Sequence, residues 1–103
     1  MALYYIGDPC YVLTDEQIAE GDYYSFDTAH GDGIYWDDDD NRYGVDSGCL
    51  ACIEVDDITE VDRLNEILDL NLAHTFEFDD LLADDCSYAE GVITFGGVAI
   101  DTN

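Results

Sequence analysis

The sequence predicts one α+β domain over residues 1–103, with an antiparallel, strongly twisted or barrel-like sheet and one main helix at about residues 59–71. Three observations favour this fold class: short strand-like segments separated by turn residues, one clear helical pattern, and a composition of 48% hydrophobic and 13% aromatic residues. A chain of this length and composition can form one core and is too apolar to be a disordered acidic tail.

Nine segments have the β-branched and aromatic composition that is typical of strands. They are Leu3–Ile6, Cys10–Leu13, Tyr23–Ala29, Ile34–Trp36, Tyr43–Val45, Cys49–Val55, Thr75–Phe78, Val92–Phe95 and Val98–Ile100. Turn residues separate them, and Gly96-Gly97 predicts a hairpin between the last two.

Two segments carry helical signals. Thr14 and Gln17 have the spacing of a capping box, which predicts one or two helical turns that end at Gly21. The main helix is expected at about 59–71, where apolar residues recur at helical spacing and acidic residues occupy the opposite face. Its apolar face consists of Val61, Leu64, Ile67, Leu68 and Leu72.

The charge of the chain is extreme. It has 26 acidic residues, two arginines (Arg42 and Arg63) and no lysine, so the formal net charge is −24. Such a charge destabilises a folded protein by self-repulsion, which suggests either a basic partner or a very salty environment. Direct nucleic-acid binding is excluded, because phosphates would repel this surface. The first residues, MALYYIGDPCYV, resemble neither a signal peptide nor a membrane span, so we expect a cytoplasmic location in a host cell, with reduced cysteines.

The stretch from His30 to Asp57 is the main indication of function. Its centre is a turn with four consecutive aspartates, whose mutual repulsion should spread them into solvent, between aromatic strands. Tyr35 and Trp36 beside the turn either add contact area or pack in the core. Together with the other paired carboxylates, the turn gives the expected partner-binding residues. They are Asp37, Asp38, Asp39, Asp40, Asp56, Asp57, Asp79, Asp80, Asp84 and Asp85.

Metal binding is not expected. In a calcium loop that begins at Asp37, the sixth position would be Arg42 and the twelfth Gly48, which does not match an EF-hand. Cys49 and Cys52 have the spacing of half a zinc site, but in a strand they point to opposite faces, and free buried cysteine is the simpler interpretation.

Catalysis is not expected either. His30 and His74 have no nucleophile at a recognisable spacing, and with so many carboxylates no single pair is informative. The sequence therefore predicts a protein that is not an enzyme, with no catalytic residue, no metal and no cofactor.

The remaining hypothesis is imitation of DNA. B-DNA carries one negative charge per about 1.7 Å, so a folded domain with dense carboxylates can occupy a basic DNA-binding groove. Nineteen of the 26 acids are aspartate, whose short side chain fixes charge at a low entropic cost. We expect a non-enzymatic inhibitor that binds the DNA-binding groove of a host defence complex. The preferred target is a CRISPR surveillance complex, which would make the protein an anti-CRISPR protein. The alternative target is a restriction enzyme or another DNA-processing enzyme. The alternative is a halophilic acidic domain of unrelated function.

Parts of the first half resemble a group of small uncharacterised proteins of phages and bacteria. The resemblance rests on Tyr5–Val12 (YIGDPCYV), Thr28–Gly33 (TAHGDG) and Tyr43–Gly48 (YGVDSG), and implies a phage context. In size and composition alone, the chain is also similar to phage-encoded DNA mimics, namely anti-restriction proteins, uracil-DNA glycosylase inhibitors and several anti-CRISPR proteins.

Overall fold

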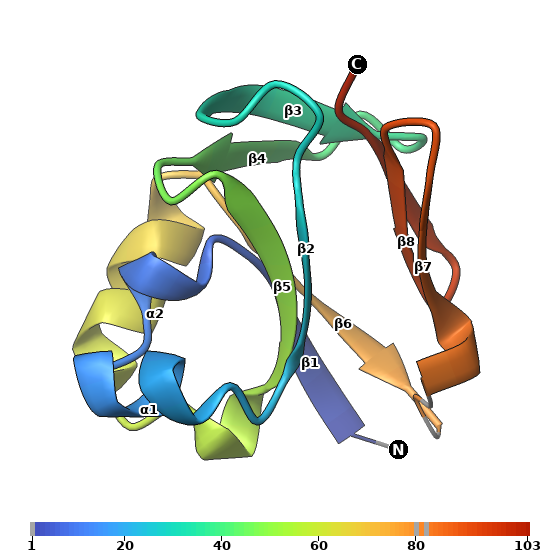
Figure 1. Cartoon of the computed structure of the whole chain (residues 1–103). Helices are drawn as coiled ribbons and strands as arrows, with labels where there is room; N and C mark the ends of the chain where they lie inside the picture. Colours follow the sequence, from blue (N-terminus) through green and yellow to red (C-terminus); the bar gives the residue numbers. More distant parts are fainter. Residues whose placement is uncertain (1, 80, 82) are drawn as a thin grey trace.

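The chain forms two antiparallel sheets and one main helix within residues 2–79, 81 and 83–103, which the computed structural model describes (Figure 1). The first sheet has the strand order β2-β5-β1-β6 and consists of β1 (Ala2–Gly7), β2 (Tyr24–Asp27), β5 (Cys49–Glu54) and β6 (His74–Phe78). The second has the order β4-β3-β9-β8-β7 and consists of β3 (Gly33–Asp37), β4 (Arg42–Val45), β7 (Cys86–Ala89), β8 (Val92–Phe95) and β9 (Val98–Asp101). The predicted α+β class is confirmed, but the strands do not close into a barrel.

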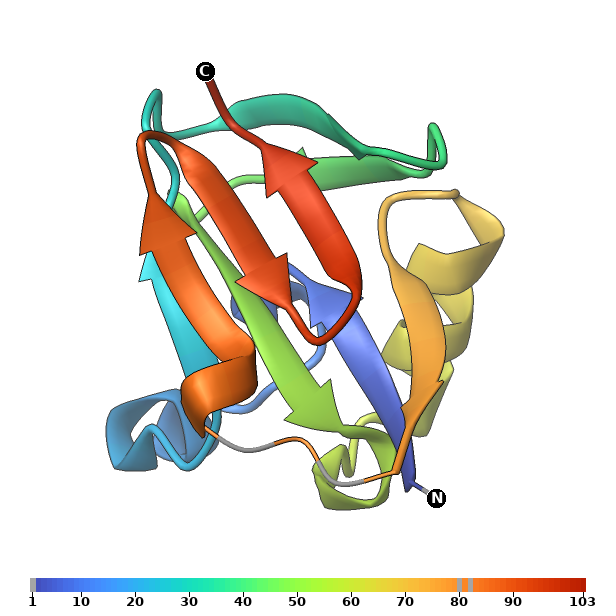
Figure 2. The same ribbon diagram turned by 90° about the vertical axis from the view of Figure 1, so that its right-hand side faces the viewer.

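The first sheet is the middle layer of the molecule, because β5 is apolar on both faces. Leu50 and Cys52 point into a core between the two sheets, which also contains Phe95 of β8. Ala51 and Ile53 point the other way, into a second core under the helices. Such a near-continuous apolar run is typical of a strand that is covered on both sides. The first sheet therefore lies between the helices and strands β7–β9 of the second sheet, while β3 and β4 of the second sheet cross the top of the molecule (Figures 1 and 2).

The predicted capping box is present at the start of α1 (Asp15–Glu20). The Thr14 side chain accepts a hydrogen bond from the Gln17 backbone N–H at 3.2 Å, and the Gln17 side chain accepts one from the Thr14 N–H at 3.1 Å. Gly21 ends the helix with a φ of 67°, in the left-handed region that favours glycine.

The main helix α2 spans Val61–Asp69, so it is shorter than predicted at both ends. Leu64 is buried in the second core, and Ile67 and Leu68 pack against it. Val61, the first residue of α2, has the spacing of the same face but is 54% exposed and does not join the core.

The structure also corrects one predicted strand and adds one that the sequence did not predict. The segment Cys10–Leu13 is not a strand, because Pro9–Tyr11 form the 3₁₀ turn η1, which the Asp8 side chain caps. The edge strand β7 was not predicted. It contains no charged residue, and Tyr88 on it is 44% exposed. Short 3₁₀ turns also follow β5 and precede β7, namely η2 (Val55–Asp57) and η3 (Ala83–Asp85).

The Asp8 side chain connects two of the stretches that carry the resemblance. It is fully buried, and its carboxylate accepts hydrogen bonds from the Cys10 N–H (2.8 Å), the Asp46 N–H (2.6 Å), and both the N–H and hydroxyl of Ser47 (2.8 Å each). Four donors compensate the cost of burying this charge. Asp8, Asp46 and Ser47 in the resembling stretches therefore have a structural role in the fold.

No helix among residues 2–79, 81 and 83–103 is long and apolar enough to cross a membrane.

Candidate functional site

The carboxylates lie overwhelmingly on the surface. Among the acidic residues that the structure describes, Asp8 and Asp37 are buried, Glu54 is half-buried, and the others are exposed. Asp80, one of the predicted contact residues, lies outside the described residues. Arg42 is half-buried, and its guanidinium donates hydrogen bonds to two backbone carbonyls at the end of α2, at 3.1 and 3.2 Å. A cation at that place complements the negative end of the helix dipole.

The structure corrects the prediction for Asp37. This residue ends β3 with only 8% of its surface exposed, and its carboxylate accepts four hydrogen bonds. The donors are the Asp39 N–H (2.9 Å), the Asn41 N–H (2.9 Å), the Asn41 amide (3.0 Å) and the Tyr43 hydroxyl (2.8 Å). Burial alone would raise the pKa of Asp37, but these hydrogen bonds outweigh it and lower the pKa. Asp37 therefore holds the turn together from inside.

The other three aspartates of the turn form an exposed acidic projection. We define the β3–β4 tip as Asp38, Asp39 and Asp40 together with Trp36. Asp40 closes the turn with a φ of 65°, and its N–H bonds to the Asp37 carbonyl at 3.1 Å. Trp36 is 52% exposed and available for contact, whereas Tyr35 is 7% exposed and belongs to the core.

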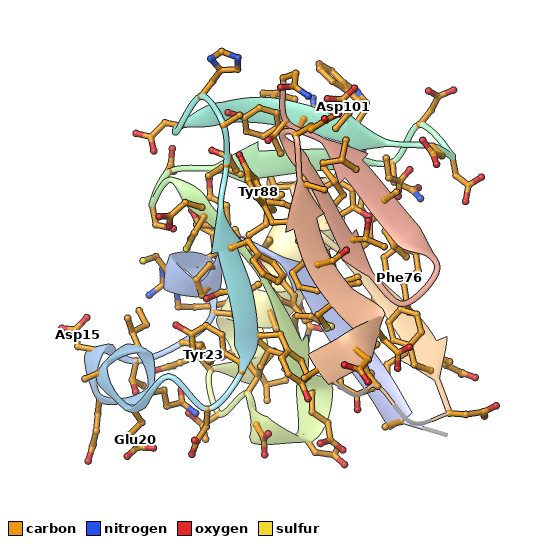
Figure 3. All side chains as sticks on the ribbon, turned by 45° about the vertical axis from the view of Figure 1, so that its right-hand side comes forward. Asp15, Glu20, Tyr23, Phe76, Tyr88 and Asp101 are labelled. Carbon is orange, nitrogen blue, oxygen red and sulfur yellow. The ribbon has the colours of Figure 1, made fainter. Side chains whose placement is uncertain are left out.

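The remaining predicted contact residues lie away from the tip. Asp56 and Asp57 belong to η2, Asp84 and Asp85 to η3, and Asp79 follows β6. Figures 1 and 2 show η2, η3 and α1 in the lower part of the molecule and the β3–β4 hairpin across the top. Figure 3 likewise shows Asp15 and Glu20 of α1 at the end of the molecule opposite to Asp101, the last residue of β9. The predicted residues therefore form at least two separate acidic surfaces.

Two pockets lie in the lower part of the molecule and share Asp22, Tyr23 and Asp57. The smaller one, of about 190 Å³, lies on the helix side of the first sheet and is further lined by Leu13, Gln17, Glu20 and Ile53. The larger one, of about 560 Å³, lies on the side that faces the second sheet and is further lined by Tyr4, Tyr24, Glu54 and Leu81, among others. We call the smaller pocket the acidic groove.

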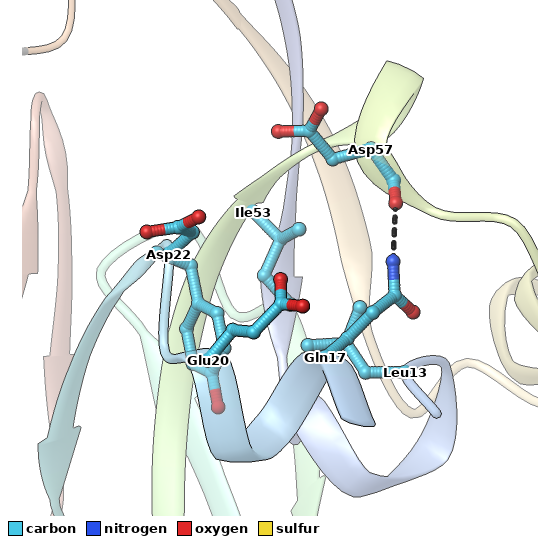
Figure 4. Close-up of a pocket in the computed structure, with 7 residues that line it drawn as sticks. Leu13, Gln17, Glu20, Asp22, Ile53 and Asp57 are labelled. Atoms are coloured by element: carbon cyan, nitrogen blue, oxygen red, sulfur yellow. Dashed lines mark hydrogen bonds between the residues drawn. The ribbon is translucent and has the colours of Figure 1, made fainter. Parts of the chain in front are cut away.

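Hydrogen bonding fixes one wall of the acidic groove. The Gln17 amide donates to the Asp57 carbonyl at 2.8 Å and so connects α1 to η2 (Figure 4). Glu20, Asp22 and Asp57 line the same pocket as Ile53 (Figure 4). The groove thus combines an apolar floor with a negative rim.

The groove offers a binding surface but no activated nucleophile. Burial, with smaller contributions from nearby thiols and Asp8, raises the pKa of the Tyr23 phenol, so this ring stays neutral at physiological pH. Burial also raises the pKa of the Cys52 thiol to about 12, and a protonated thiol is a poor nucleophile. Within the described part of the chain, no three His, Cys, Asp or Glu side chains are arranged to hold a metal ion.

Cys49 and Cys52 lie in different surroundings. Cys52 faces the core between the sheets, whereas Cys49 is half-buried and contacts the Ser47 hydroxyl at 3.4 Å.

The chain matches no protein-family model, no curated protein sequence and no solved structure. The resemblance to phage proteins remains a prediction.

Proposed function

We propose that this protein is a non-enzymatic DNA mimic that occupies the basic DNA-binding groove of a host defence complex in the host cytoplasm. The observation that carries the proposal is the presentation of the carboxylates, since nearly all those described are exposed on a framework of two packed sheets. A ligand whose charges are already in place loses little conformational entropy when it binds.

The β3–β4 tip illustrates this arrangement. The buried carboxylate of Asp37 binds the backbone N–H groups of Asp39 and Asn41 and so fixes the path of the turn. The three exposed aspartates of the tip are therefore held on a rigid hairpin, in the way that a duplex holds successive phosphates.

The preferred target is a CRISPR surveillance complex, and a restriction enzyme or another DNA-processing enzyme is the second choice. Both bind DNA through basic grooves, and the charge of this chain is complementary to such a surface. The exposed Trp36 of the tip favours a contact surface over the halophilic alternative, because tryptophan is enriched in protein interfaces and contributes little to hydration.

DNA competition tests the proposal. A complex captured on the immobilised protein from host lysate is purified, and its binding to a labelled duplex is measured with and without the protein. We expect the protein to displace the duplex and to bind less tightly as salt is raised from 0.05 to 0.5 M, because screening shortens the reach of surface charges. A complex that holds the protein and still binds DNA normally contradicts groove occupancy.

A charge variant locates the contact. The tip triple variant, Asp38→Asn with Asp39→Asn and Asp40→Asn, keeps the buried Asp37 and should stay folded while its inhibition weakens. Each exposed pair is worth about 0–1 kcal/mol, so we expect roughly a tenfold loss for the three together. Full inhibition by this variant would move the contact to the opposite end of the molecule.

The halophilic alternative has its own test. Circular dichroism should show a folded protein at about 0.15 M salt, where the Debye length is about 8 Å. A chain that folds only above roughly 1 M salt, where the Debye length is about 3 Å, would support a halophilic domain.

A further inference from the structure

The acidic groove is concave and negatively charged, and none of the described residues that line it is basic. Its rim carries the exposed carboxylates of Glu20, Asp22 and Asp57. Arg42 and Arg63, the only arginines of the chain, belong to β4 and α2 and line neither pocket. The Gln17 amide is already bonded to the Asp57 carbonyl. The carboxylates at this rim therefore have no basic side chain of their own chain within the groove.

The lining is also suited to a side chain that is apolar along its length and charged at its end. Leu13 and Ile53 at the floor are 5% and 2% exposed and belong to the second core, so the floor is apolar and well packed. Tyr23 presents a neutral ring that is shared by both pockets. Long basic side chains bury their methylene groups on such surfaces and keep their charged ends among polar groups.

We propose that the acidic groove binds the guanidinium group of an arginine side chain that projects from the basic surface of the partner. The inference rests on the proposed function, because a basic DNA-binding groove is the surface that presents such an arginine. It adds a specific receptor to the diffuse charge attraction of the tip.

Guanidinium fits this lining better than ammonium. Its planar face stacks on aromatic rings such as Tyr23, and its donors can bond two carboxylate oxygens at once. The groove has carboxylates on more than one wall, and the N–H donors of a guanidinium group point in several directions, so more than one of these carboxylates can accept from it. Lysine has a compact and strongly hydrated charge, which gains less from an aromatic surface.

The test needs no knowledge of the partner. Three blocked tripeptides, acetyl-Gly-Xaa-Gly-amide with arginine, lysine or citrulline at the centre, are titrated into the protein at 0.15 M NaCl. Citrulline has nearly the shape of arginine without its charge. NMR of the methyl groups of Leu13 and Ile53 reports groove occupancy. We expect saturable shifts with the arginine peptide, at least threefold weaker binding of the lysine peptide, and no saturation with citrulline.

A pair of matched variants separates a specific site from general attraction. The groove triple variant, Glu20→Gln with Asp22→Asn and Asp57→Asn, removes three charges, as the tip triple variant does. We expect the groove triple variant to bind the arginine peptide at least tenfold more weakly, or about 1.4 kcal/mol, and the tip triple variant to change binding less than twofold.

Several results would overturn the proposal. Equal weakening by the two variants would mean nonspecific attraction, equal binding of lysine would mean a general cation site, and absence of saturable shifts would mean no site. The peptide comparison on the unchanged protein holds even if the groove triple variant does not fold.

The outcome is also independent of the DNA competition experiment. If the unchanged protein displaces DNA and the groove triple variant displaces it equally well, the arginine site is refuted and the DNA mimic stands. If the arginine peptide binds in the groove but no complex loses DNA, the mimic is refuted and the site stands.

Discussion

Replacement of Asp37 by alanine should destabilise the protein far more than the same change at the neighbouring Asp38. Both residues belong to the same run of aspartates and carry the same formal charge. Asp38 is exposed, whereas the carboxylate of Asp37 accepts four hydrogen bonds at 2.8 to 3.0 Å. The comparison therefore separates the structural role of a buried carboxylate from the effect of charge.

The magnitude follows from the partners that Asp37→Ala leaves behind. The two backbone N–H groups and the Asn41 amide lie at a turn that water can reach, so water replaces part of those bonds. The Tyr43 side chain is fully buried, and its hydroxyl would lose its carboxylate acceptor. A hydrogen bond to a charged group contributes about 1.5–3 kcal/mol, and a buried unsatisfied group costs about 1–3 kcal/mol. We expect a total loss of about 3 kcal/mol, out of the roughly 5–15 kcal/mol typical of a domain.

Urea unfolding followed by far-ultraviolet circular dichroism measures this loss. With a slope of about 1–3 kcal/mol per molar urea, the midpoint for Asp37→Ala should fall by about 1–3 M. Asp38→Ala should change the free energy of unfolding by no more than about 0.5 kcal/mol. If the two variants have equal midpoints, the buried carboxylate does not hold the turn, and the reasoning fails.

Acid provides a second arm of the same experiment. The pKa of Asp37 is lower in the folded state than its ordinary value, so as pH falls the unfolded chain takes up this proton first. The stability that Asp37 contributes is present above its unfolded pKa of about 3.9 and is lost as pH falls through the folded value. The difference between the unchanged protein and Asp37→Ala should therefore shrink below about pH 4. A difference that is constant from pH 7 to pH 3 would refute this.

Two further predictions concern the basic and thiol groups. Arg42→Ala should lower the free energy of unfolding by about 1–2 kcal/mol, because it removes two hydrogen bonds and a favourable charge at the end of α2. Arg63→Ala removes the same charge from an exposed position and should lower the free energy of unfolding by less than about 0.5 kcal/mol. Calorimetry measures both losses, and equal losses would contradict the role of Arg42. With a thiol reagent at pH 8, the exposed Cys10 should react at once, whereas the buried Cys52, with a pKa of about 12, should react only after denaturant is added. Fast labelling of Cys52 in the folded protein would contradict its burial.

Much of the fold could be predicted because local signals agreed with the tertiary structure. The capping box at Thr14, the helix around Leu64 and the hairpin at Gly96-Gly97 are each determined by residues close in sequence. The segment Cys10–Leu13 was assigned wrongly because its apolar pattern was weighed above the start signal before it. Asp8 followed by Pro9 is a cap followed by a residue with its φ already helical, which favours a helical turn.

Other features depend on contacts between distant segments. The strand β7 has no β-branched residue, and it forms because it pairs with β8. The acidic groove combines residues 13–23 with Ile53 and Asp57, which nothing in the local sequence connects.

The burial of Asp37 could not be predicted from the sequence alone, because the sequence left open which of Tyr35 and Trp36 faces the core. Once Tyr35 is known to be buried and Trp36 exposed, the alternation of β3 places Asp37 on the inner face. The run of four aspartates obscured this, because in sequence its members are identical.

The uncharged edge of the second sheet gives the acidity of this chain another purpose. Unprotected edge strands are starting points for pairing between copies, and many proteins protect them with a lysine, a proline or a bulge on the edge itself. The segment Cys86–Ala89 has neither charge nor proline. We expect repulsion between molecules of charge −24, with Asp85 and Glu90 directly flanking β7, to oppose such pairing once two copies come close. The same carboxylates that would attract a partner should thus also limit aggregation, and neutralising them should weaken both properties together.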